Sequence, residues 1–241
     1  ALSPFNIEAE QLLQCSWLPP RGRALTSRLS RRWLPRVMGA PVWREPYFHY
    51  SSDFAALSGP VFLEGYWQSE QYFREIRPQL LQEFSLRGAL PPATALLHEK
   101  IGSSDSICVH VRRGDYLSNP VAASVHGTCS LEYYSRGVNE LARELNDPHC
   151  FVFSDDPDWV RDSMNLGYPM TVVDVNGASD AHLDLILMAA CKHFVIANSS
   201  LSWWGAWLGG FPMKKVIAPA RWFLTSDKDT KDLLPEAWLR R

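Results

Sequence analysis

Short apolar runs alternate with longer amphipathic stretches from about residue 100 to the end of the chain. The runs are rich in Val, Ile and Phe, have the length of strands, and cover residues 106–111, 150–154, 170–175, 193–198 and 215–219. Between them, residues 131–145 and 181–191 repeat apolar positions at the helical period. Strands alternating with helices predict a parallel sheet, so we expect a Rossmann-like, doubly wound α/β domain.

The first hundred residues show a less regular pattern. Residues 61–66 resemble a strand, 69–84 resemble one or two helical turns around Pro78, and 87–94 resemble a linker. We therefore expect two domains, a partial N-terminal one over residues 1–95 and the Rossmann-like one over residues 96–241.

The charge balance excludes some classes of protein. The chain has 24 Lys and Arg against 26 Asp and Glu, and a formal net charge of −2, which disfavours a strongly basic nucleic-acid binder. Apolar stretches such as Leu185–Cys191 are far shorter than the roughly 18 to 20 residues of a membrane-spanning helix, so no span is expected.

One basic segment stands apart from this balance. Residues 21–36 contain six arginines and no acid, with apolar residues at every fourth position. The segment predicts a solvated helix face, and the alternative is a basic patch, Arg21 to Arg36, facing anionic lipid or a lipid-linked substrate.

The cysteines and aromatic residues each allow a plain structural interpretation. Five cysteines are widely spaced, mostly in apolar runs, and predict free thiols in a reducing compartment, hence a cytoplasmic protein. No CxxC, HExxH or Cys/His cluster occurs, which argues against a zinc site. Ten tryptophans favour a core role, with a platform for sugars as the alternative.

Polar residues follow the predicted strands, where ligands bind in an open parallel sheet. Two arginines, Arg112 and Arg113, come directly after the first strand, and solubility alone does not require them there. The other strands end in Ser154-Asp155-Asp156, Asp174-Val175-Asn176 and Asn198-Ser199-Ser200. One anion-binding crevice accounts for all of these ends.

Side-chain alternation predicts which arginine leads at the ligand. His110 and Arg112 should share one face of the strand, with Arg113 on the other. We choose Arg112, because a guanidinium stays charged and offers paired donors to phosphate oxygens. Residues 198–200 precede a helical stretch, so Ser199 and Ser200 predict a second anion site at its start, the alternative being a plain N-cap.

Asp184 lies on the helix before the fourth strand and could accept hydrogen bonds from guanine, although a surface carboxylate in a first helical turn needs no ligand. The fingerprints of other nucleotide enzymes are missing. No G-x-G occurs. Gly205 and Gly210 have the spacing of a P-loop, but Phe211 follows them where a P-loop has lysine.

Four blocks of the sequence resemble the bacterial α-1,2-fucosyltransferases of glycosyltransferase family 11. They are GYWQSEQYF (65–73), HVRRGDY (110–116), FSDD (153–156) and DLILMAACKHFVIANSSLSWWGAWL (184–208). The resemblance implies a GT-B-like inverting transferase that moves L-fucose from GDP-β-L-fucose to the 2-hydroxyl of a galactoside, without a metal or another cofactor.

The resemblance also implies roles for single residues. Arg112 would contact the β-phosphate, and His110, Asp184, Ser199 and Ser200 would help to hold the nucleotide. Arg113, Asp155, Asp156 and Asn198 complete the expected donor site, and Tyr66, Trp67 and Gln68 are expected on the acceptor side. Residues 96–241 would then bind the GDP-sugar, and residues 1–95 would face a galactoside acceptor.

The catalytic base stays open. Asp115 is the nearest candidate, but it could equally orient an arginine through an ion pair, and a departing phosphate oxygen could take the proton instead. The glycine-rich loop with which the family begins has no counterpart here, so we expect the chain to start inside the first domain.

Two alternative functions remain. Another GDP-sugar or GDP-fucose transferase would use the same donor site with a different linkage. A lectin is the more distant alternative, supported by the tryptophan content and by the adhesion tripeptide Arg113-Gly114-Asp115. Nucleotide binding separates a lectin from a transferase, because a lectin needs no phosphate crevice.

Overall fold

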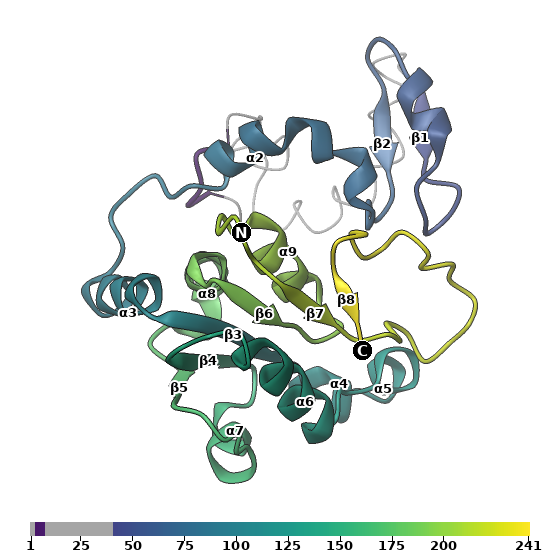
Figure 1. Ribbon diagram of the computed structural model, residues 1–241. Coiled ribbons are helices and arrows are strands. Elements are labelled where there is room, and N and C mark those ends of the chain that lie inside the picture. Colours follow the sequence, from purple (N-terminus) through teal and green to yellow (C-terminus); the bar gives the residue numbers. More distant parts are fainter. Residues whose placement is uncertain (1–2, 8–40) are drawn as a thin grey trace, which may run out of the picture.

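Six parallel strands form the centre of the computed structural model, which describes residues 3–7 and 41–241 (Figure 1). They are β3 (Asp105–Val111), β4 (Pro148–Ser154), β5 (Met170–Val173), β6 (His193–Val195), β7 (Val216–Ala218) and β8 (Leu239–Arg240). Their order in the sheet is β5-β4-β3-β6-β7-β8. This is the Rossmann order, which runs outward in both directions from the first strand of the unit.

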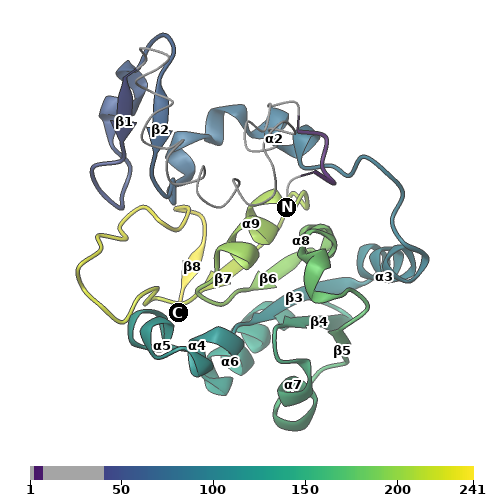
Figure 2. The ribbon, with the colours of Figure 1, turned by 180° about the vertical axis from the view of Figure 1, so that it is seen from behind.

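Helices cover both faces of this sheet, as Figures 1 and 2 show from opposite sides. One face carries α3 (Pro92–Ser103), α8 (Ala181–Ala190) and α9 (Ser200–Leu208), and the other carries α6 (Leu131–Ala142) and α7 (Pro157–Ser163). Alternate strand residues supply the two cores, with Cys108 on the first side and Val109 on the second. The predicted Rossmann-like doubly wound sheet is confirmed.

Helices α8 and α9 pack in close contact because one of them carries a glycine at the contact. A Cβ atom on Gly205 would lie 2.8 Å from the Cβ of Met188, closer than real side chains come. Both helices are strongly apolar. Residues of both belong to the buried core on this side of the sheet, and α8 lies between the sheet and the N-terminal part of the chain.

Two cationic side chains cap the C-terminal end of α9. Lys214 Nζ donates to the carbonyls of Ala206, Trp207 and Gly209 at 2.7, 3.2 and 2.8 Å. Arg77 Nη2 donates to the carbonyls of Trp207 and Gly209 at 3.0 and 3.2 Å. These donors satisfy carbonyls that have no partner inside the helix and complement its negative end.

The N-terminal part contains a short parallel ribbon and several helical turns. The ribbon is β1 (Val42–Arg44) with β2 (Phe62–Glu64). The turns are η2 (Ser52–Ala56), η3 (Glu70–Tyr72), η4 (Arg74–Ile76) and α2 (Arg77–Glu83). The predicted strand and helical turns of this part are confirmed.

The predicted linker is partly wrong, because α3 begins inside it at Pro92. Proline suits the first turn of a helix, where its missing N–H costs no hydrogen bond. The division between residues 95 and 96 falls within α3 and stays a prediction. Helices α4 (Gly114–Ser118) and α5 (Pro120–His126) and the strands β1 and β8 were not predicted, since each is too short to show a period.

Aromatic side chains join this part to α9. Trp204 lies between two nearly parallel rings, Phe73 at 5.1 Å and Phe84 at 5.5 Å. Trp203 is buried, and its Nε1 donates to the carbonyl of Leu233 at 2.9 Å. The core interpretation therefore holds for this tryptophan pair.

The thiols of Cys108, Cys150 and Cys191 are free and buried, as predicted, and the free thiol of Cys129 is half-buried. Cys15 and the arginine-rich segment 21–36 lie outside the described residues. Over residues 3–7 and 41–241, none of the helices has the length and apolar character needed to cross a bilayer.

Candidate functional site

A cavity of about 470 Å³ opens at the carboxyl ends of β3, β4 and β5, beside the first turns of α8 and α9. The chain leaves β3 toward β4 on one side and enters β6 on the other, so this is the point where the strand order reverses. Ligands of open α/β sheets bind at such points. We name this cavity the strand-end crevice; it is lined by His110, Arg112, Phe153, Ser154, Asp155, Pro157, Val173, Asp174, Asn176, Gly177, Ala181, Asp184, Met188 and Leu201.

Arg112 lies in the crevice between an acid and an aromatic ring. Its Nη1 is 3.2 Å from Asp155 Oδ2, and its guanidinium carbon lies 5.6 Å from the centre of the Tyr116 ring. These two contacts orient a permanently charged group that is still about one-third exposed. The side chain is therefore placed to meet an anion.

Arg113 points elsewhere, as the alternation along β3 predicts. Its guanidinium lies 3.6 Å from the centre of the Trp159 ring on α7, and its Nε is 3.7 Å from Asp156 Oδ2. It does not line the crevice. Asp156 caps α7 by accepting from the amide of Trp159 at 3.2 Å, so both residues fix the outer side of the strand ends.

Asp155 holds the turn that carries the arginines. Its Oδ1 accepts from the amide of Arg113 at 2.9 Å, while Oδ2 faces Arg112. A Cβ on Gly114 would lie 2.8 Å from that same Oδ2, so the glycine gives Asp155 room to approach. Asp115 lies in α4, and its side chain is outside the described part of the structure. Arg112 pairs with Asp155 and Arg113 with Asp156, and the role of Asp115 stays a prediction.

His110 forms the floor of the crevice beside Arg112. It is 3% exposed, and its Nδ1 is buried without a hydrogen bond to a described residue. Burial lowers the pKa of His110 from 6.5 to about 4; Asp155 acts in the opposite direction, and Arg112 lowers the pKa further. The imidazole is therefore neutral at neutral pH and offers one donor or acceptor nitrogen to a bound molecule.

Asp184 faces the crevice from the first turn of α8. Its Oδ1 accepts from Asn176 Nδ2 at 2.7 Å. Burial raises the pKa of Asp184, and the hydrogen bond from Asn176 lowers it in part. Thr94 Oγ1 donates to Asn176 Oδ1 at 2.8 Å, which fixes the amide that orients the carboxylate.

The start of α9 meets the crevice through Leu201. Ser199 occupies the N-cap position, as the N-cap interpretation expects, but its side chain makes no capping hydrogen bond. Ser200 is exposed at the first helical position. Ser199 is buried, and neither serine lines the crevice itself, although both stand next to the backbone amides of the helix start.

Asn198 has a different set of partners. Its side-chain Nδ2 donates to the backbone carbonyls of His126 and Trp222 at 2.8 and 3.1 Å. Its backbone carbonyl accepts from the Tyr116 hydroxyl at 3.0 Å. The side chain ties together α5 and the segment around Trp222, and it does not line the crevice.

The residues expected on the acceptor side separate in the structure. Tyr66 is 77% exposed and lines another cavity, next to β2. Trp67, with φ of 54°, packs against Trp43 with ring centres 5.6 Å apart. Gln68 Nε2 donates to the carbonyl of Tyr66 at 3.2 Å. Only Tyr66 of the three faces an open cavity.

Sequence reasoning did not single out three residues that support the crevice. They are Tyr116, Asn176 and Trp159, which contact Arg112, Asp184 and Arg113. Asn176 stands in a polar strand end that was noticed, Tyr116 ends the HVRRGDY block but was given no role, and no pattern identified Trp159. Within the described residues, no group of three or more His, Cys, Asp or Glu side chains is arranged to hold a metal ion.

Comparisons with known proteins agree on one family. The model of "Glycosyl transferase family 11" matches residues 39–236. An "Alpha-1,2-colitosyltransferase" of Escherichia coli is 36% identical over 77% of this chain and 64% of its own length. The "O-antigen biosynthesis glycosyltransferase WbnK" of E. coli is 34% identical over 57% of this chain and 45% of its own.

A more distant relative comes from a primate. The "Galactoside alpha-(1,2)-fucosyltransferase 1" of Leontopithecus chrysomelas is 28% identical over 84% of this chain and 59% of its own. The chain thus spans about half to two-thirds of the length of these relatives. A solved E. coli ADP-heptose lps heptosyltransferase II overlaps 64% of this chain and 44% of its own, with a TM-score of 0.37 and 16% identity.

Proposed function

The chain belongs to glycosyl transferase family 11, and from this premise we propose that it transfers L-fucose from GDP-β-L-fucose to the 2-hydroxyl of a terminal galactoside with inversion. The similarity to the galactoside alpha-(1,2)-fucosyltransferase 1 of Leontopithecus chrysomelas supports this proposal. Donor and acceptor would meet in a GT-B-like arrangement, with residues 96–241 on the donor side and residues 1–95 contributing to the acceptor side.

One observation carries this proposal, the position of Arg112 in the strand-end crevice. Cleavage of the fucose–phosphate bond leaves negative charge on GDP and positive charge on the sugar. A guanidinium oriented by Asp155 and Tyr116 can stabilise the departing diphosphate at the end of β3. The hydroxyl residues and amides at the start of α9 supply a second set of donors.

The remaining crevice residues suit the rest of the nucleotide. Asp184, oriented by Asn176, would accept from guanine N1–H and the exocyclic amine. His110 would add one hydrogen bond from a neutral ring at the crevice floor. Arg113, Asp156 and Asn198 would support the donor site indirectly through their contacts with Trp159 and α5.

For the proton of the acceptor hydroxyl we propose two receivers, Asp115 or a departing phosphate oxygen. A general base usually contributes 10²- to 10⁴-fold to the rate. If Asp115 is the base, Asp115→Asn should lower kcat within that range and remove the acidic limb of the pH profile. An unchanged profile assigns the proton to the phosphate.

A second candidate is transfer of colitose in place of fucose. The identity of 36% with the E. coli colitosyltransferase favours it. Competition between fucose and colitose donors under one set of conditions decides between them by the ratio of kcat/KM.

The direct test incubates the chain with GDP-fucose and a panel of β-galactosides and determines the linkage of each product by NMR. We expect an α-1,2-fucosyl product. A product of another linkage would indicate the related GDP-sugar transferase. Galactoside binding without any GDP binding in calorimetry would indicate a lectin, and either result would overturn the proposal.

The setting of the reaction also remains a proposal. Free thiols at Cys108, Cys150 and Cys191 support a reducing, cytoplasmic compartment. Peripheral membrane contact, with a lipid-linked acceptor, would involve the arginine-rich segment 21–36.

A further inference from the structure

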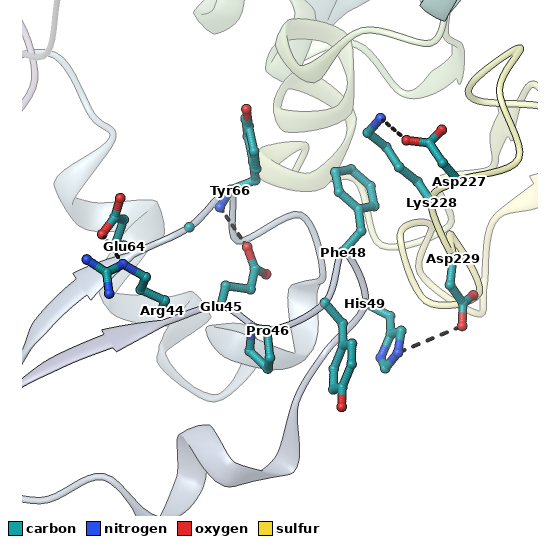
Figure 3. Close-up of a pocket in the computed structure, with 12 residues that line it drawn as sticks. Arg44, Glu45, Pro46, Phe48, His49, Glu64, Tyr66, Asp227, Lys228 and Asp229 are labelled. Atoms are coloured by element: carbon teal, nitrogen blue, oxygen red, sulfur yellow. Dashed lines mark hydrogen bonds and ion pairs between the residues drawn. The ribbon is translucent and has the colours of Figure 1, made fainter.

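A second cavity, of about 780 Å³, lies between the β1–β2 ribbon and a loop near the C-terminus (Figure 3). Three segments far apart in sequence line it, residues 44–49, 64–66 and 227–229. Its volume falls within the roughly 300–1,000 Å³ of small-molecule sites. We name it the ribbon cavity; apart from Tyr66, none of its residues was singled out in the sequence.

Two exposed tyrosines give the ribbon cavity its aromatic surface. Tyr47 is 58% exposed and stacks on His49, with ring centres 4.8 Å apart and planes at 7°. Tyr66 is 77% exposed and lies 6.3 Å from Phe48. Aromatic rings that line a concave surface offer a ligand apolar faces that otherwise contact water. The rings can pack against the C–H faces of a sugar while their hydroxyls bond to it.

The turn that carries Tyr66 is fixed by a carboxylate. Glu45 Oε2 accepts from the amides of Tyr66 and Trp67 at 2.7 and 3.2 Å. Trp67 adopts a positive φ of 54°, which is uncommon for a non-glycine residue, and it is held by the rings around it. The backbone that carries Tyr66 is therefore positioned before any ligand arrives.

The charged groups of the ribbon cavity are arranged in pairs. Arg44 Nε lies 2.8 Å from Glu64, Lys228 Nζ lies 3.1 Å from Asp227, and His49 Nε2 lies 3.8 Å from Asp229. Figure 3 shows Tyr66 and Phe48 between the Arg44–Glu64 pair and the loop that carries Asp227, Lys228 and Asp229. The lining also holds more carboxylates than fixed cations. Such a surface offers hydrogen-bond donors and acceptors to the hydroxyl groups of a ligand. It repels a ligand that carries a negative charge.

A series of ring contacts connects the ribbon cavity with the strand-end crevice. Phe48 contacts Phe223 at 5.2 Å, and Phe223 contacts His126 at 5.4 Å. His126 stacks on Tyr116 at 4.7 Å, and Tyr116 lies under Arg112. The wall of one cavity is thus packed continuously onto the residue proposed to hold the diphosphate.

From these observations we infer that the ribbon cavity binds the neutral sugar residues of the acceptor, with Tyr47 and Tyr66 as stacking platforms. The inference rests on the proposed transfer reaction, since it gives that reaction its acceptor subsite. Exposed tyrosines and self-paired charges favour an uncharged glycan over one that carries a carboxylate.

The test measures lactose binding by saturation-transfer NMR and GDP binding by calorimetry, with KM for lactose where transfer is observed. We expect Tyr66→Ala and Tyr47→Ala each to weaken lactose binding about three- to tenfold, as the loss of one ring contact would. Tyr66→Phe keeps the ring and loses only the hydroxyl, so it should weaken lactose binding less than Tyr66→Ala does. GDP affinity should not change in any of them.

Met213→Ala is the matched control, because Met213 is similarly exposed but lies outside the ribbon cavity. Unchanged lactose binding in both tyrosine variants would overturn the inference, and so would a wild-type chain that binds no lactose. Binding of 3′-sialyllactose as tight as lactose would overturn the preference for neutral sugars.

The two proposals fail differently. A chain that binds lactose through Tyr66 but never transfers fucose refutes the proposed function and keeps the subsite. A chain that transfers fucose with normal KM in both tyrosine variants keeps the function and refutes the subsite.

Discussion

The strand-end crevice and the ribbon cavity differ in the length and burial of the strands that support them. Strands β3 and β4 have seven residues each and are almost wholly buried, so the charged groups at their ends have little freedom. Strands β1 and β2 have three residues each and are largely exposed. The first region can hold fixed charge against a reaction that moves charge, whereas the second presents rings and loops that can vary with the ligand.

Loss of Arg112 should separate the two regions most sharply. We expect Arg112→Ala to lower the transfer rate by on the order of 100- to 1000-fold, because a preorganised donor to the leaving group is lost. Arg112→Lys should restore little, since a point charge does not reproduce the guanidinium fork. Single-turnover kinetics measures the effect, and lactose binding should be unaltered.

Arg136→Ala is the control for this variant, because Arg136 is an exposed arginine of α6 that pairs with Glu132 and does not line the strand-end crevice. Turnover close to that of the wild type in Arg112→Ala would remove the distinction between a catalytic crevice and a recognition cavity.

The buried histidine should make the stability of the crevice sensitive to acid. His110 has a folded pKa of about 4 against 6.5 for the ordinary side chain. The contribution of the neutral imidazole to the free energy of unfolding is fully present above pH 6.5. It is lost as the pH falls toward 4, because only the unfolded chain takes up the proton there. The shift corresponds to roughly 3 kcal/mol of unfolding free energy.

Denaturant unfolding between pH 7 and 4.5 measures this slope. His110→Gln should show a shallower loss of stability on acidification, and His98→Gln on α3 should keep the wild-type slope. Parallel curves for His110→Gln and the wild type would show that the crevice floor is hydrated.

Asp184 tests whether the crevice reads the nucleobase. Asp184→Asn replaces an acceptor with a donor and should weaken GDP binding roughly ten- to a hundredfold for each charge-assisted bond lost. The preference for GDP over IDP, which lacks the exocyclic amine, should shrink as well. Calorimetry with both nucleotides gives the coupling between the two deletions.

Asp180→Asn is the neighbouring control, since Asp180 precedes α8 and does not line the crevice. A wild-type ratio of GDP to IDP affinity in Asp184→Asn would reduce Asp184 to a helix-surface carboxylate and move the guanine reader to Asp155, Asp156 or His110.

Chelation should have the smallest effect of all. Asp155 and Asp156, the two acids that a divalent ion would need, already face Arg112 and Arg113. We expect the transfer rate to be unchanged in EDTA. A loss of activity that magnesium or manganese restores would show that both acids turn toward a metal, and the crevice would then depend on an ion and not on arginine alone.

The crevice could be predicted because short stretches of sequence decide which way its side chains face. A buried strand followed by Arg112 and Arg113 fixes which side chain faces which side, through the two-residue repeat alone. The sheet then brings separate strand ends together. The contacts of Asn198 could not be predicted, because its partners on α5 and near Trp222 depend on how two loops meet.

The ribbon cavity escaped prediction for the same physical reason. Its walls come from segments about 160 residues apart, and no period or motif links Tyr47 to Asp229. The family resemblance pointed to residues 66–68. In the structure Trp67 packs in a cluster of aromatic rings, whereas Tyr66 is exposed. Exposed aromatic residues need a structure before they can be told from core.

The capped end of α9 has a mechanical consequence. Arg77 belongs to the N-terminal part, and it is bonded to carbonyls of the helix whose other end meets the crevice. Any swing of α2 away from the sheet must break these bonds and unstack Phe73 from Trp204. The N-terminal part is thus held at α2 and again beside the β1–β2 ribbon, where Phe48 contacts Phe223, so a movement of one end must strain the contacts at the other.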